Sequence, residues 1–319
     1  MPAPDPAGTH TPSSTPSART LAGSEAGRYL LLLELAAGGM GSVYVGRLRG
    51  AAGFERLVAI KRMHQHVMAD RELVLSFHEE ARIASLVQHP NVVQVLDVYE
   101  ENNEHMLVME YVDGVSLSVL AKAARKVRTT IPLPVAVRIA IDAARGLHAA
   151  HETRGLDGQP LRVVHRDVSP HNILVAANGS VRVTDFGIAH AILRTVHTEQ
   201  GELKGKVRYM SPEQAECRPL DRRADVFSLG IVLWELLTGE PLYAGLDTLA
   251  NLRLATAAHV DPPSSRVPTI PRELDAIVLC ALARDPAARY ATAEAFANDL
   301  EAWAATSRSL ATPADVAAT

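Results

Sequence analysis

Three side chains with oxygen ligands surround a short predicted β-hairpin. Asp167 and Asn172 precede its first strand, and Asp185 follows its second strand. Carboxylate and amide oxygens are the ligands that Mg²⁺ prefers, and phosphate groups can supply the others. Asn172 and Asp185 are therefore candidate magnesium ligands, with Asp167 in the adjoining loop. The alternative is that these residues only cap the turns at the ends of the hairpin.

The turn of this hairpin determines how these side chains meet. Two short apolar runs, typical of strands, flank Asn178-Gly179, a dipeptide that tolerates positive φ. A two-residue turn there would place Asn172 opposite Asp185 in an uninterrupted ladder. The predicted hairpin thus brings the amide and the carboxylate to one point.

A glycine-containing stretch near the N-terminus has the composition of a phosphate-binding loop. It lies between two strand-like runs, and its glycines let backbone amides approach phosphate oxygens closely. An ordinary hairpin turn has the same composition, so this stretch alone does not distinguish the two. The candidate nucleotide-binding residues of this stretch are Leu35, Ala36, Ala37, Gly38, Gly39, Met40, Gly41, Ser42 and Val43.

Lys61 supports the phosphate-binding interpretation. Only five of the 32 basic side chains are lysines, so a lysine where this chain normally uses arginine is informative. Lys61 ends a strand-like Val-Ala-Ile-Lys run and shares a face with Ala59, which predicts that both side chains point inward. A compact ammonium there suits a point contact with a phosphate.

Glu80 is the predicted partner of Lys61. A helix is predicted over residues 70–87, with Asp70 as its N-cap, and Glu80 lies on or beside its apolar stripe. An ionised carboxylate in that position is costly unless it meets a cation. The alternative is a glutamate at a solvated rim, which is the expectation for the neighbouring Glu79.

The rest of the chain predicts a folded region between two flexible ends. Residues 1–27 are rich in Pro, Ser, Thr, Ala and Gly and predict a disordered leader, whereas residues 306–319 predict a flexible tail. Strand-like runs dominate up to residue 112, and the pattern from 113 to 305 is mainly helical. A boundary between two lobes is therefore expected near residue 113.

Composition and charge argue against several classes of protein. The 319 residues carry 32 basic and 36 acidic side chains, a net charge of −4, which gives no general reason to bind nucleic acid or an anionic membrane. Two isolated cysteines are too few for a disulfide framework and favour a reducing, cytoplasmic environment. No apolar run reaches the roughly 20 residues of a membrane helix, so no membrane span is expected.

Taken in order, these residues resemble the eukaryotic-like protein kinase family, in its bacterial serine/threonine branch. The resemblance extends over about residues 28–303, and the order of its motifs makes it specific. Beyond the residues above, the matching motifs are His165-Arg166-Asp167, Asp185-Phe186-Gly187, Ser211-Pro212-Glu213, Asp225 and Arg289.

The resemblance implies an α+β, bilobal fold. Residues 28–112 would form an N-lobe, with a small antiparallel sheet and one main helix, together with the hinge. Residues 113–305 would form a larger, mostly helical C-lobe. The implied cofactors are ATP and Mg²⁺, and the implied partners are proteins with serine or threonine acceptors.

The resemblance also implies a role for each matching residue. Asp167 would orient the substrate hydroxyl and accept its proton. Asn172 and Asp185 would hold Mg²⁺. Lys61, paired with Glu80, would grip the α- and β-phosphates of ATP. Further nucleotide contacts are expected from Ala59, from Met109 at the back of the pocket, and from the hinge residues Glu110 and Val112.

Two features of the C-lobe would be architectural. Glu213 and Arg289 resemble a buried ion pair of the helical lobe. Asp225 resembles the carboxylate that braces the catalytic loop, at the start of an apolar helix that ends at Gly239. These residues are expected to position the site without touching the reacting atoms.

Three positions depart from the family pattern. Ala36 stands in place of the first loop glycine, Ser169 in place of a lysine that contacts the γ-phosphate, and Lys206 in place of a threonine that packs against that lysine. A lysine lost at 169 and gained at 206 could move one positive charge between neighbouring loops. Lys206 is therefore a candidate catalytic residue, and the alternative is a solvated Lys206 in a slow enzyme.

The leading function is a serine/threonine protein kinase that phosphorylates its own activation segment. Thr195 and Thr198 lie in that segment, and Arg166 resembles the arginine that binds the resulting phosphate. One alternative is a weakly active or inactive nucleotide-binding scaffold, disabled by Ser169. Another is a phosphotransferase that acts on small molecules; the complete activation segment through Glu213 favours peptide substrates instead.

Overall fold

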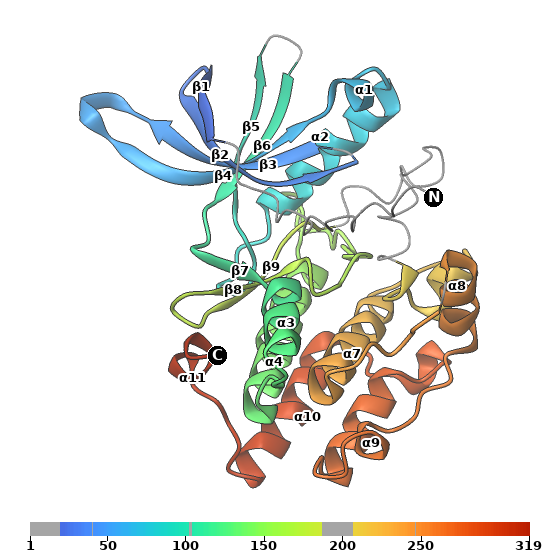
Figure 1. The fold of residues 1–319 in the computed structure, drawn as a ribbon. Coiled ribbons are helices and arrows are strands. Elements are labelled where there is room, and N and C mark those ends of the chain that lie inside the picture. Colours follow the sequence, from blue (N-terminus) through green and yellow to red (C-terminus); the bar gives the residue numbers. More distant parts are fainter. Residues whose placement is uncertain (1–19, 40, 102–103, 187–206, 246) are drawn as a thin grey trace, which may run out of the picture.

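The computed structural model describes residues 20–319 apart from residues 40, 102–103, 187–206 and 246 (Figure 1). In the described part, a β-sheet lies over a group of helices (Figure 1). The sheet and one long helix form the N-lobe, whereas a small three-stranded sheet and the other longer helices form the C-lobe. The predicted α+β, two-lobed fold is confirmed.

The N-lobe sheet has six antiparallel strands in the order β1-β2-β3-β4-β6-β5. Alternation along β6 shows how it is buried on both sides: Leu107 and Met109 face the long helix, whereas Met106 and Val108 join the cluster on the opposite face. The strands are β1 (Thr20–Ala26), β2 (Tyr29–Gly38), β3 (Gly41–Arg49), β4 (Glu55–Met63), β5 (Val95–Glu101) and β6 (Glu104–Glu110), with a 3-10 turn η1 (Ala51–Gly53).

The long N-lobe helix is α2 (Arg71–Ser85), preceded by the single turn α1 (Gln65–Met68). The predicted N-cap is confirmed, because Asp70 Oδ1 accepts a hydrogen bond from the backbone N–H of Glu72 at 2.9 Å. The apolar stripe, which includes Phe77, is buried against the sheet. The helix ends two residues before the predicted boundary.

The C-lobe is built around two buried helices, α4 and α7. α7 is buried on every side and ends at Gly239, whose φ of 74° is the left-handed cap that glycine favours. Trp234 of α7 donates to Asp261 O at 2.9 Å, and Trp303 packs against the same core from a neighbouring helix. The C-lobe elements are β7 (Gly114–Ser116), α3 (Leu117–Lys126), α4 (Leu133–His151), β8 (Ile173–Ala176), β9 (Val181–Val183), α6 (Pro212–Ala215), α7 (Arg223–Thr238), α8 (Thr248–Ala257), η2 (Pro263–Ser265), α9 (Arg272–Ala281), η3 (Pro286–Ala288), α10 (Ala293–Thr306) and α11 (Pro313–Ala317).

The register of the β8–β9 hairpin differs from the prediction by one residue. Ala176, and not Ala177, pairs with Ser180, because Ala176 N donates to Ser180 O at 2.9 Å. The loop therefore has three residues, and Gly179 takes the left-handed φ of 80° that such a loop needs at its last position. The predicted pairing of Asn172 with Asp185 is wrong for this reason.

The predicted disordered leader is wrong for residues 20–26. These residues form β1, which pairs antiparallel with β2. Gly27, with φ of 53°, allows the tight turn that folds β1 back onto the edge of β2. Backbone pairing stabilises a strand whose sequence has no apolar alternation. Residues 1–19 lie outside the described part.

The predicted flexible tail is also wrong in the described structure. Ala311 and Val316 are buried in the C-lobe core, and the short helix α11 lies against the β8–β9 hairpin. Thr312 and Asp315 form a capping box at the start of α11. The signal was present in the sequence as a threonine followed three residues later by an aspartate.

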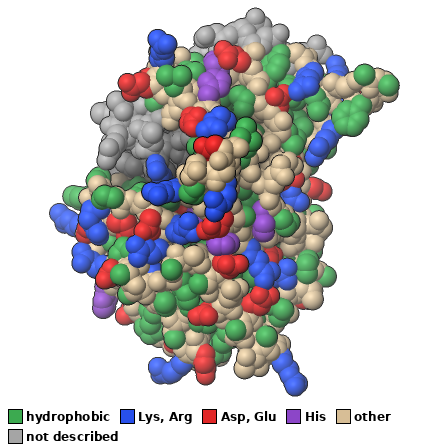
Figure 2. All heavy atoms as spheres, turned by 180° about the vertical axis from the view of Figure 1, so that it is seen from behind, with side chains coloured by type: hydrophobic (Ala, Val, Ile, Leu, Met, Phe, Trp, Pro, Cys, Tyr) green, Lys and Arg blue, Asp and Glu red, His purple; other side chains and the backbone are tan. Residues whose placement is uncertain are grey.

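Acidic and basic side chains are intermixed over the rear face of the molecule, as Figure 2 shows. This distribution matches the near balance of 32 basic and 36 acidic residues in the sequence. In the part of the chain that the structure describes, no helix combines the length and apolarity needed to cross a bilayer.

Candidate active site

Lys61 and Asp185 join the two lobes. Lys61 lies on β4, and its Nζ is 2.7 Å from Oδ1 of Asp185, which follows β9 in the C-lobe. Both side chains are partly buried, so water weakens this ion pair less than one on the surface. The predicted pairing of Lys61 with Glu80 stays a prediction, because the side chain of Glu80 lies outside the described part.

Asp225 holds the backbone of the catalytic loop. Its carboxylate accepts hydrogen bonds from the backbone N–H groups of His165 at 2.7 Å and Arg166 at 2.8 Å. Arg166 has a φ of 65°, which is unfavourable for a residue with a side chain, so the loop needs this support. The predicted brace is present at the start of α7.

A histidine beneath the loop explains how a fully buried aspartate stays charged. His151 Nε2 lies 2.8 Å from Asp225 Oδ2, and both side chains are almost inaccessible to water. Burial raises the pKa of Asp225, but the hydrogen bonds from the His151 side chain and from the backbone N–H of His165 outweigh it, so the pKa lies below its usual value. Asp225 therefore remains an ionised acceptor near neutral pH.

His165 connects the catalytic loop to the end of β9. Its Nδ1 accepts from the backbone N–H of Asp167 at 3.3 Å, and its Nε2 lies 3.0 Å from Thr184 O. One ring nitrogen is thus an acceptor and the other a donor, as in a neutral imidazole. The ring also packs against Phe186, with 4.8 Å between centroids. These contacts fix the residues on either side of Asp185.

Asn172 is bound to the backbone on both sides of the site. Its Nδ2 donates to Asp167 O at 2.8 Å, and its own carbonyl accepts from Thr184 N at 3.0 Å. Thr184 immediately precedes Asp185, whose φ is 56°. The structure thus gathers the three oxygen-bearing residues, although Asn172 faces Thr184 and not Asp185.

The donor set at this point fits a hard divalent cation. The side-chain nitrogen of Asn172 is engaged with Asp167 O, so its amide oxygen is the atom left for a ligand role. Asp185 supplies a carboxylate, one oxygen of which contacts Lys61. One or two oxygen side chains, completed by phosphate oxygens and water, are typical of Mg²⁺. Asn172 and Asp185 are the residues that would hold the ion.

The glycine stretch forms the hairpin between β2 and β3. Gly38 pairs with Gly41 across the turn, and His64 Nε2 lies 2.9 Å from Gly38 O. A Cβ on Gly41 would lie 2.4 Å from Arg62 O, so only glycine fits there. Ala36 is part of β2, a conformation that any residue adopts, which accounts for the absence of glycine.

The hinge follows β6. Met109 is buried, and it pairs with Ala59 on β4. The backbone N–H of Glu110 donates to Gln94 O at 2.9 Å, while its carboxylate accepts from Gln94 N at 2.9 Å and also contacts Arg182. The side chain of Glu110 is therefore committed to the protein, which leaves the backbone of the following residues to contact a nucleotide.

Ser169 is buried, and its carbonyl accepts from the backbone N–H of Asn172 at 3.0 Å. Its small side chain therefore sits inside the catalytic loop. Five residues of the sequence prediction lie outside the described part: Met40, Gly187, Thr195, Thr198 and Lys206.

The predicted ion pair of the C-lobe is present. Arg289 donates to Glu213 Oε1 at 2.7 Å and Oε2 at 2.9 Å, and both side chains are buried. Burial raises the pKa of Glu213, but the bond from Arg289 outweighs it and holds the pKa below the usual range. This bidentate pair fixes the start of α6 to the loop before α10.

Two contacts that support the catalytic loop were not predicted from the sequence. Gln214 Nε2 donates to Arg166 O at 2.8 Å and thereby ties the loop to α6. His151 supports Asp225 from the end of α4. The spacing of Ser211 and Gln214 is a capping box, which is present in the structure and could have been recognised. A buried histidine at the end of an apolar helix gives no such signal.

Comparison with known proteins agrees with this geometry. The profile of the protein kinase domain matches residues 29–300. The chain belongs to this family. Over 277 residues it is 46% identical to the tyrosine-protein kinase MasK of Myxococcus xanthus, covering 87% of this chain and 43% of MasK. It is 36% identical to the serine/threonine-protein kinase PrkC of Bacillus subtilis, covering 86% of this chain and 40% of PrkC.

Solved structures show the same kinase fold. The kinase domain of Mycobacterium tuberculosis PknI superposes with a TM-score of 0.66 at 25% identity, and the match covers 88% of this chain and 98% of that domain. The chain spans less than half of the length of MasK and PrkC. The similarity therefore concerns the kinase domain of these longer proteins.

Proposed function

We propose that this kinase domain transfers the γ-phosphoryl group of ATP to serine or threonine hydroxyls of proteins. The observation that carries the proposal is the catalytic loop. Asp225 fixes its backbone, and the loop gathers Asp167 and Asn172 beside the end of β9, where Asp185 contacts Lys61. Membership of the family and the order of the motifs support it.

The chain's own residues account for binding and orientation. The backbone amides of the β2–β3 hairpin would cover the phosphates, and the hinge backbone after Glu110 would contact adenine. Lys61 would place a positive charge on the α- and β-phosphates. Mg²⁺, when bound by Asn172 and Asp185, would neutralise charge on the transferring group.

Asp167 is the proposed proton acceptor. Its backbone N–H is fixed by His165 and its carbonyl by Asn172, so its carboxylate is carried on a rigid loop. From there it would orient the acceptor hydroxyl and take up its proton as the phosphoryl group is transferred. No covalent intermediate on the enzyme is needed, because alignment and charge neutralisation supply the catalysis.

Two further parts of the proposal rest on residues outside the described part. Lys206 would supply the positive charge that Ser169 lacks. Thr195 and Thr198 would be autophosphorylation sites, with Arg166 as the cation that receives the phosphate. Proteins with Ser or Thr acceptors would be the partners, and a cytoplasmic location would match the free thiols of Cys217 and Cys280.

A second candidate is transfer to tyrosine. The relative with 46% identity is named a tyrosine-protein kinase, and Ser169 replaces the lysine that marks the serine/threonine branch. The hydroxyl acceptor of tyrosine stands farther from the peptide backbone, so the two candidates require different depths of the substrate site.

One experiment separates these functions. The protein would be incubated with radiolabelled ATP, Mg²⁺ and a generic protein substrate, beside the variant Asp167→Asn, and the products hydrolysed for phosphoamino-acid analysis. We expect phosphoserine and phosphothreonine that depend on Asp167. Phosphotyrosine alone would favour the second candidate, whereas nucleotide binding without transfer would identify a scaffold. Phosphopeptide mapping of the same protein would test Thr195 and Thr198.

A further inference from the structure

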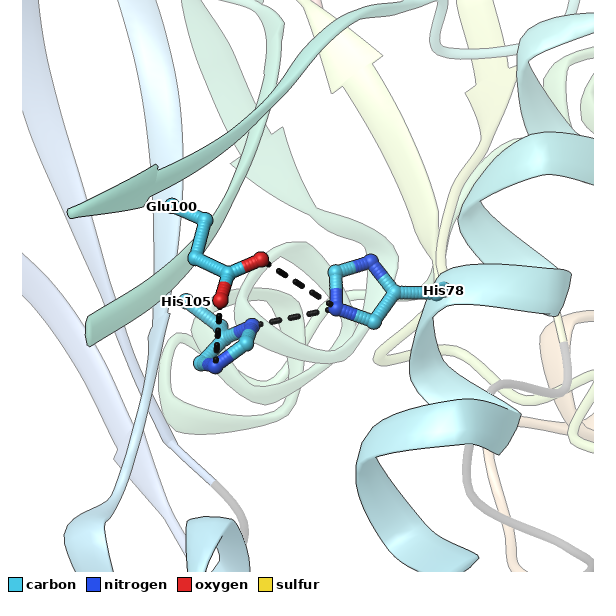
Figure 3. A group of neighbouring side chains, drawn as sticks. All are labelled: His78, Glu100 and His105. Atoms are coloured by element: carbon cyan, nitrogen blue, oxygen red, sulfur yellow. Dashed lines mark hydrogen bonds and ion pairs between the residues drawn. The ribbon is translucent and has the colours of Figure 1, made fainter. Parts of the chain in front are cut away.

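His78, Glu100 and His105 converge at one point of the N-lobe, away from the catalytic loop (Figure 3). His78 projects from α2, and the other two project from β5 and β6. His78 Nε2 lies 3.1 Å from His105 Nδ1 and 3.9 Å from Glu100 Oε2. One ligand atom from each residue lies within 4.8 Å of those from the other two.

These separations match the needs of a small tetrahedral cation. With metal–nitrogen bonds of about 2.0–2.1 Å, the ligand atoms of a tetrahedral zinc site lie about 3.3 Å apart. The two imidazole nitrogens are already at 3.1 Å, and the carboxylate of Glu100 is on a long side chain that is half exposed and can move closer. Glu100 Oε1 now lies 3.7 Å from His105 Nε2, the other ring nitrogen, so the Glu100 side chain has to rotate toward Nδ1 to complete the site.

The chemistry of the three residues favours zinc over magnesium. Imidazole nitrogens bind borderline-soft ions such as Zn²⁺, whereas Mg²⁺ prefers oxygen ligands and keeps its water. Two histidines and one glutamate are a common set of three protein ligands, with the fourth position left to water. The ring of His105 is 7% exposed and so would be held in place by its surroundings.

We propose that His78, Glu100 and His105 form a Zn²⁺ site that ties α2 to the β5–β6 hairpin. Among its described side chains, α2 also packs on the sheet through apolar residues such as Phe77 and Ala81, and this packing is not directional. A metal bond to His78 restricts the rotation and sliding of the helix. Glu80 lies two residues further along the same helix, so the site controls the element that carries this residue.

The experiment is a titration of metal-free protein with Zn²⁺ by calorimetry, without nucleotide and in excess Mg²⁺ to occupy the oxygen ligands at Asn172 and Asp185. We expect one equivalent of Zn²⁺ to bind. The variants His78→Gln and Glu100→Gln each remove one ligand, and we expect them to weaken binding by at least the roughly 10- to 100-fold seen when even indirect support of a metal site is lost.

The matched control is His259→Gln. His259 lies 3.9 Å from Asp261, the same separation as between His78 and Glu100, but no described residue adds a third ligand and His259 is 91% exposed. We expect this variant to bind Zn²⁺ like the wild type. Circular dichroism of each variant checks that it is folded, and Glu100→Gln, which changes an exposed side chain, guards against misfolding at His78.

A second readout locates the bound ion. Hydrogen exchange should slow in residues 71–85 and 104–110 of the wild type when Zn²⁺ is added, and should not change in His78→Gln. If both ligand variants bind Zn²⁺ as strongly as the wild type does, the zinc lies elsewhere and the proposal is overturned. Absence of binding in the wild type would also overturn it, and would leave His78 and His105 as an ordinary hydrogen-bonded pair.

Discussion

Lys61 makes an ion pair between β4 and the end of β9, and so contributes to both lobes. Its ammonium lies 2.7 Å from Asp185 Oδ1, close to where phosphates would bind. Its importance was visible in the sequence, because lysine is rare in this chain. Its contact with Asp185 was not, because the two residues are 124 positions apart and only the fold brings them together.

We expect Lys61→Met to lower kcat/KM for peptide phosphorylation by about 10²–10³-fold, the usual effect of removing one group that stabilises charge in the transition state. Lys122→Met, which removes an exposed lysine from α3, is the matched control and should keep normal activity. Steady-state rates at several ATP concentrations provide the measurement. Equal loss in both variants would show that the effect is not specific to the site.

Lys206 and Ser169 allow a test of charge relocation. We expect Lys206→Ala to lower the single-turnover rate of phosphoryl transfer far more than the affinity for ATP, because the charge is needed at the γ-phosphate. Ser169→Lys in the same variant should restore part of the rate. Rapid-quench kinetics and nucleotide titrations measure the two quantities separately. Unchanged transfer by Lys206→Ala would mean that Lys206 has no catalytic role.

Glu213 should make the free energy of unfolding depend on pH in the acidic range. Its pKa is held below the ordinary value of 4.5, so the unfolded chain takes up the proton first as the pH falls. The stabilisation by this carboxylate is therefore complete above about pH 4.5 and is lost as the pH falls through the lower pKa of the folded protein.

We expect Glu213→Gln to lower the free energy of unfolding by about 3–5 kcal/mol at neutral pH, because Arg289 is left buried without its partner. The difference from the wild type should shrink below pH 4.5. The control Glu301→Gln breaks the exposed pair with Arg145 and should cost at most about 1 kcal/mol. Urea denaturation at a series of pH values gives both results, and a pH-independent difference would contradict the explanation.

At the scale of elements, the β8–β9 hairpin shows where sequence patterns reach their limit. The apolar runs and Asn178-Gly179 correctly predicted two strands and a turn. The register was missed because Asn-Gly fits both a two-residue turn and a three-residue loop with Gly179 at its last position. Contacts with α11 accompany the second arrangement, and these come from residues more than a hundred positions away.

Other elements follow the same division. α2 and the end of α7 were predictable, because Asp70 and Gly239 are caps that act locally. β1 was not, because it gains its stability from pairing with β2. α11 has a local capping box, but its packing against the C-lobe was not predictable. Local signals therefore identify caps and apolar stripes, but they do not reveal the surface against which an element such as β1 or α11 packs.

The close contact between Gly179 and α11 can be tested by substitution. A Cβ there would lie 1.7 Å from Pro313 O, so Gly179→Ala must move α11 or the hairpin, in addition to placing alanine at φ 80°. Gly158→Ala is the matched control, because Gly158 has φ 77° with nothing within 4 Å of the added Cβ. We expect the control to lower the free energy of unfolding by about 1–2 kcal/mol, because its alanine is placed at a positive φ but contacts nothing else.

In urea denaturation, Gly179→Ala should lower the free energy of unfolding clearly more than Gly158→Ala does. Hydrogen exchange in residues 313–317 should become faster only in Gly179→Ala. If both variants lose the same free energy of unfolding, α11 moves away without loss of stability and contributes little to the hairpin. The result also bears on the site, since β8 and β9 lead directly to Asn172 and Asp185.

At the scale of the whole molecule, each lobe has its own core, and polar contacts such as the ion pair of Lys61 with Asp185 join them. The clusters around Phe77 and Tyr29 belong to the N-lobe, and the large cluster around α4 and α7 belongs to the C-lobe. The division into lobes was predictable from the change from strand-like to helical patterns near residue 113. The contacts that join the lobes include the ion pair of Lys61 with Asp185 and the backbone hydrogen bonds of Val183 with Asn91 and Val93, and no periodicity reveals them.

Both tryptophans belong to the C-lobe, Trp234 within its core and Trp303 on α10. Intrinsic emission excited in the indole band is thus a selective spectroscopic reporter of that lobe, and the β-sheet lobe is silent in the same experiment. Thermal scans that combine this emission with far-ultraviolet dichroism would show directly whether the halves melt together. A dichroism change that precedes any shift in emission would reveal a lobe that unfolds first while its neighbour stays intact.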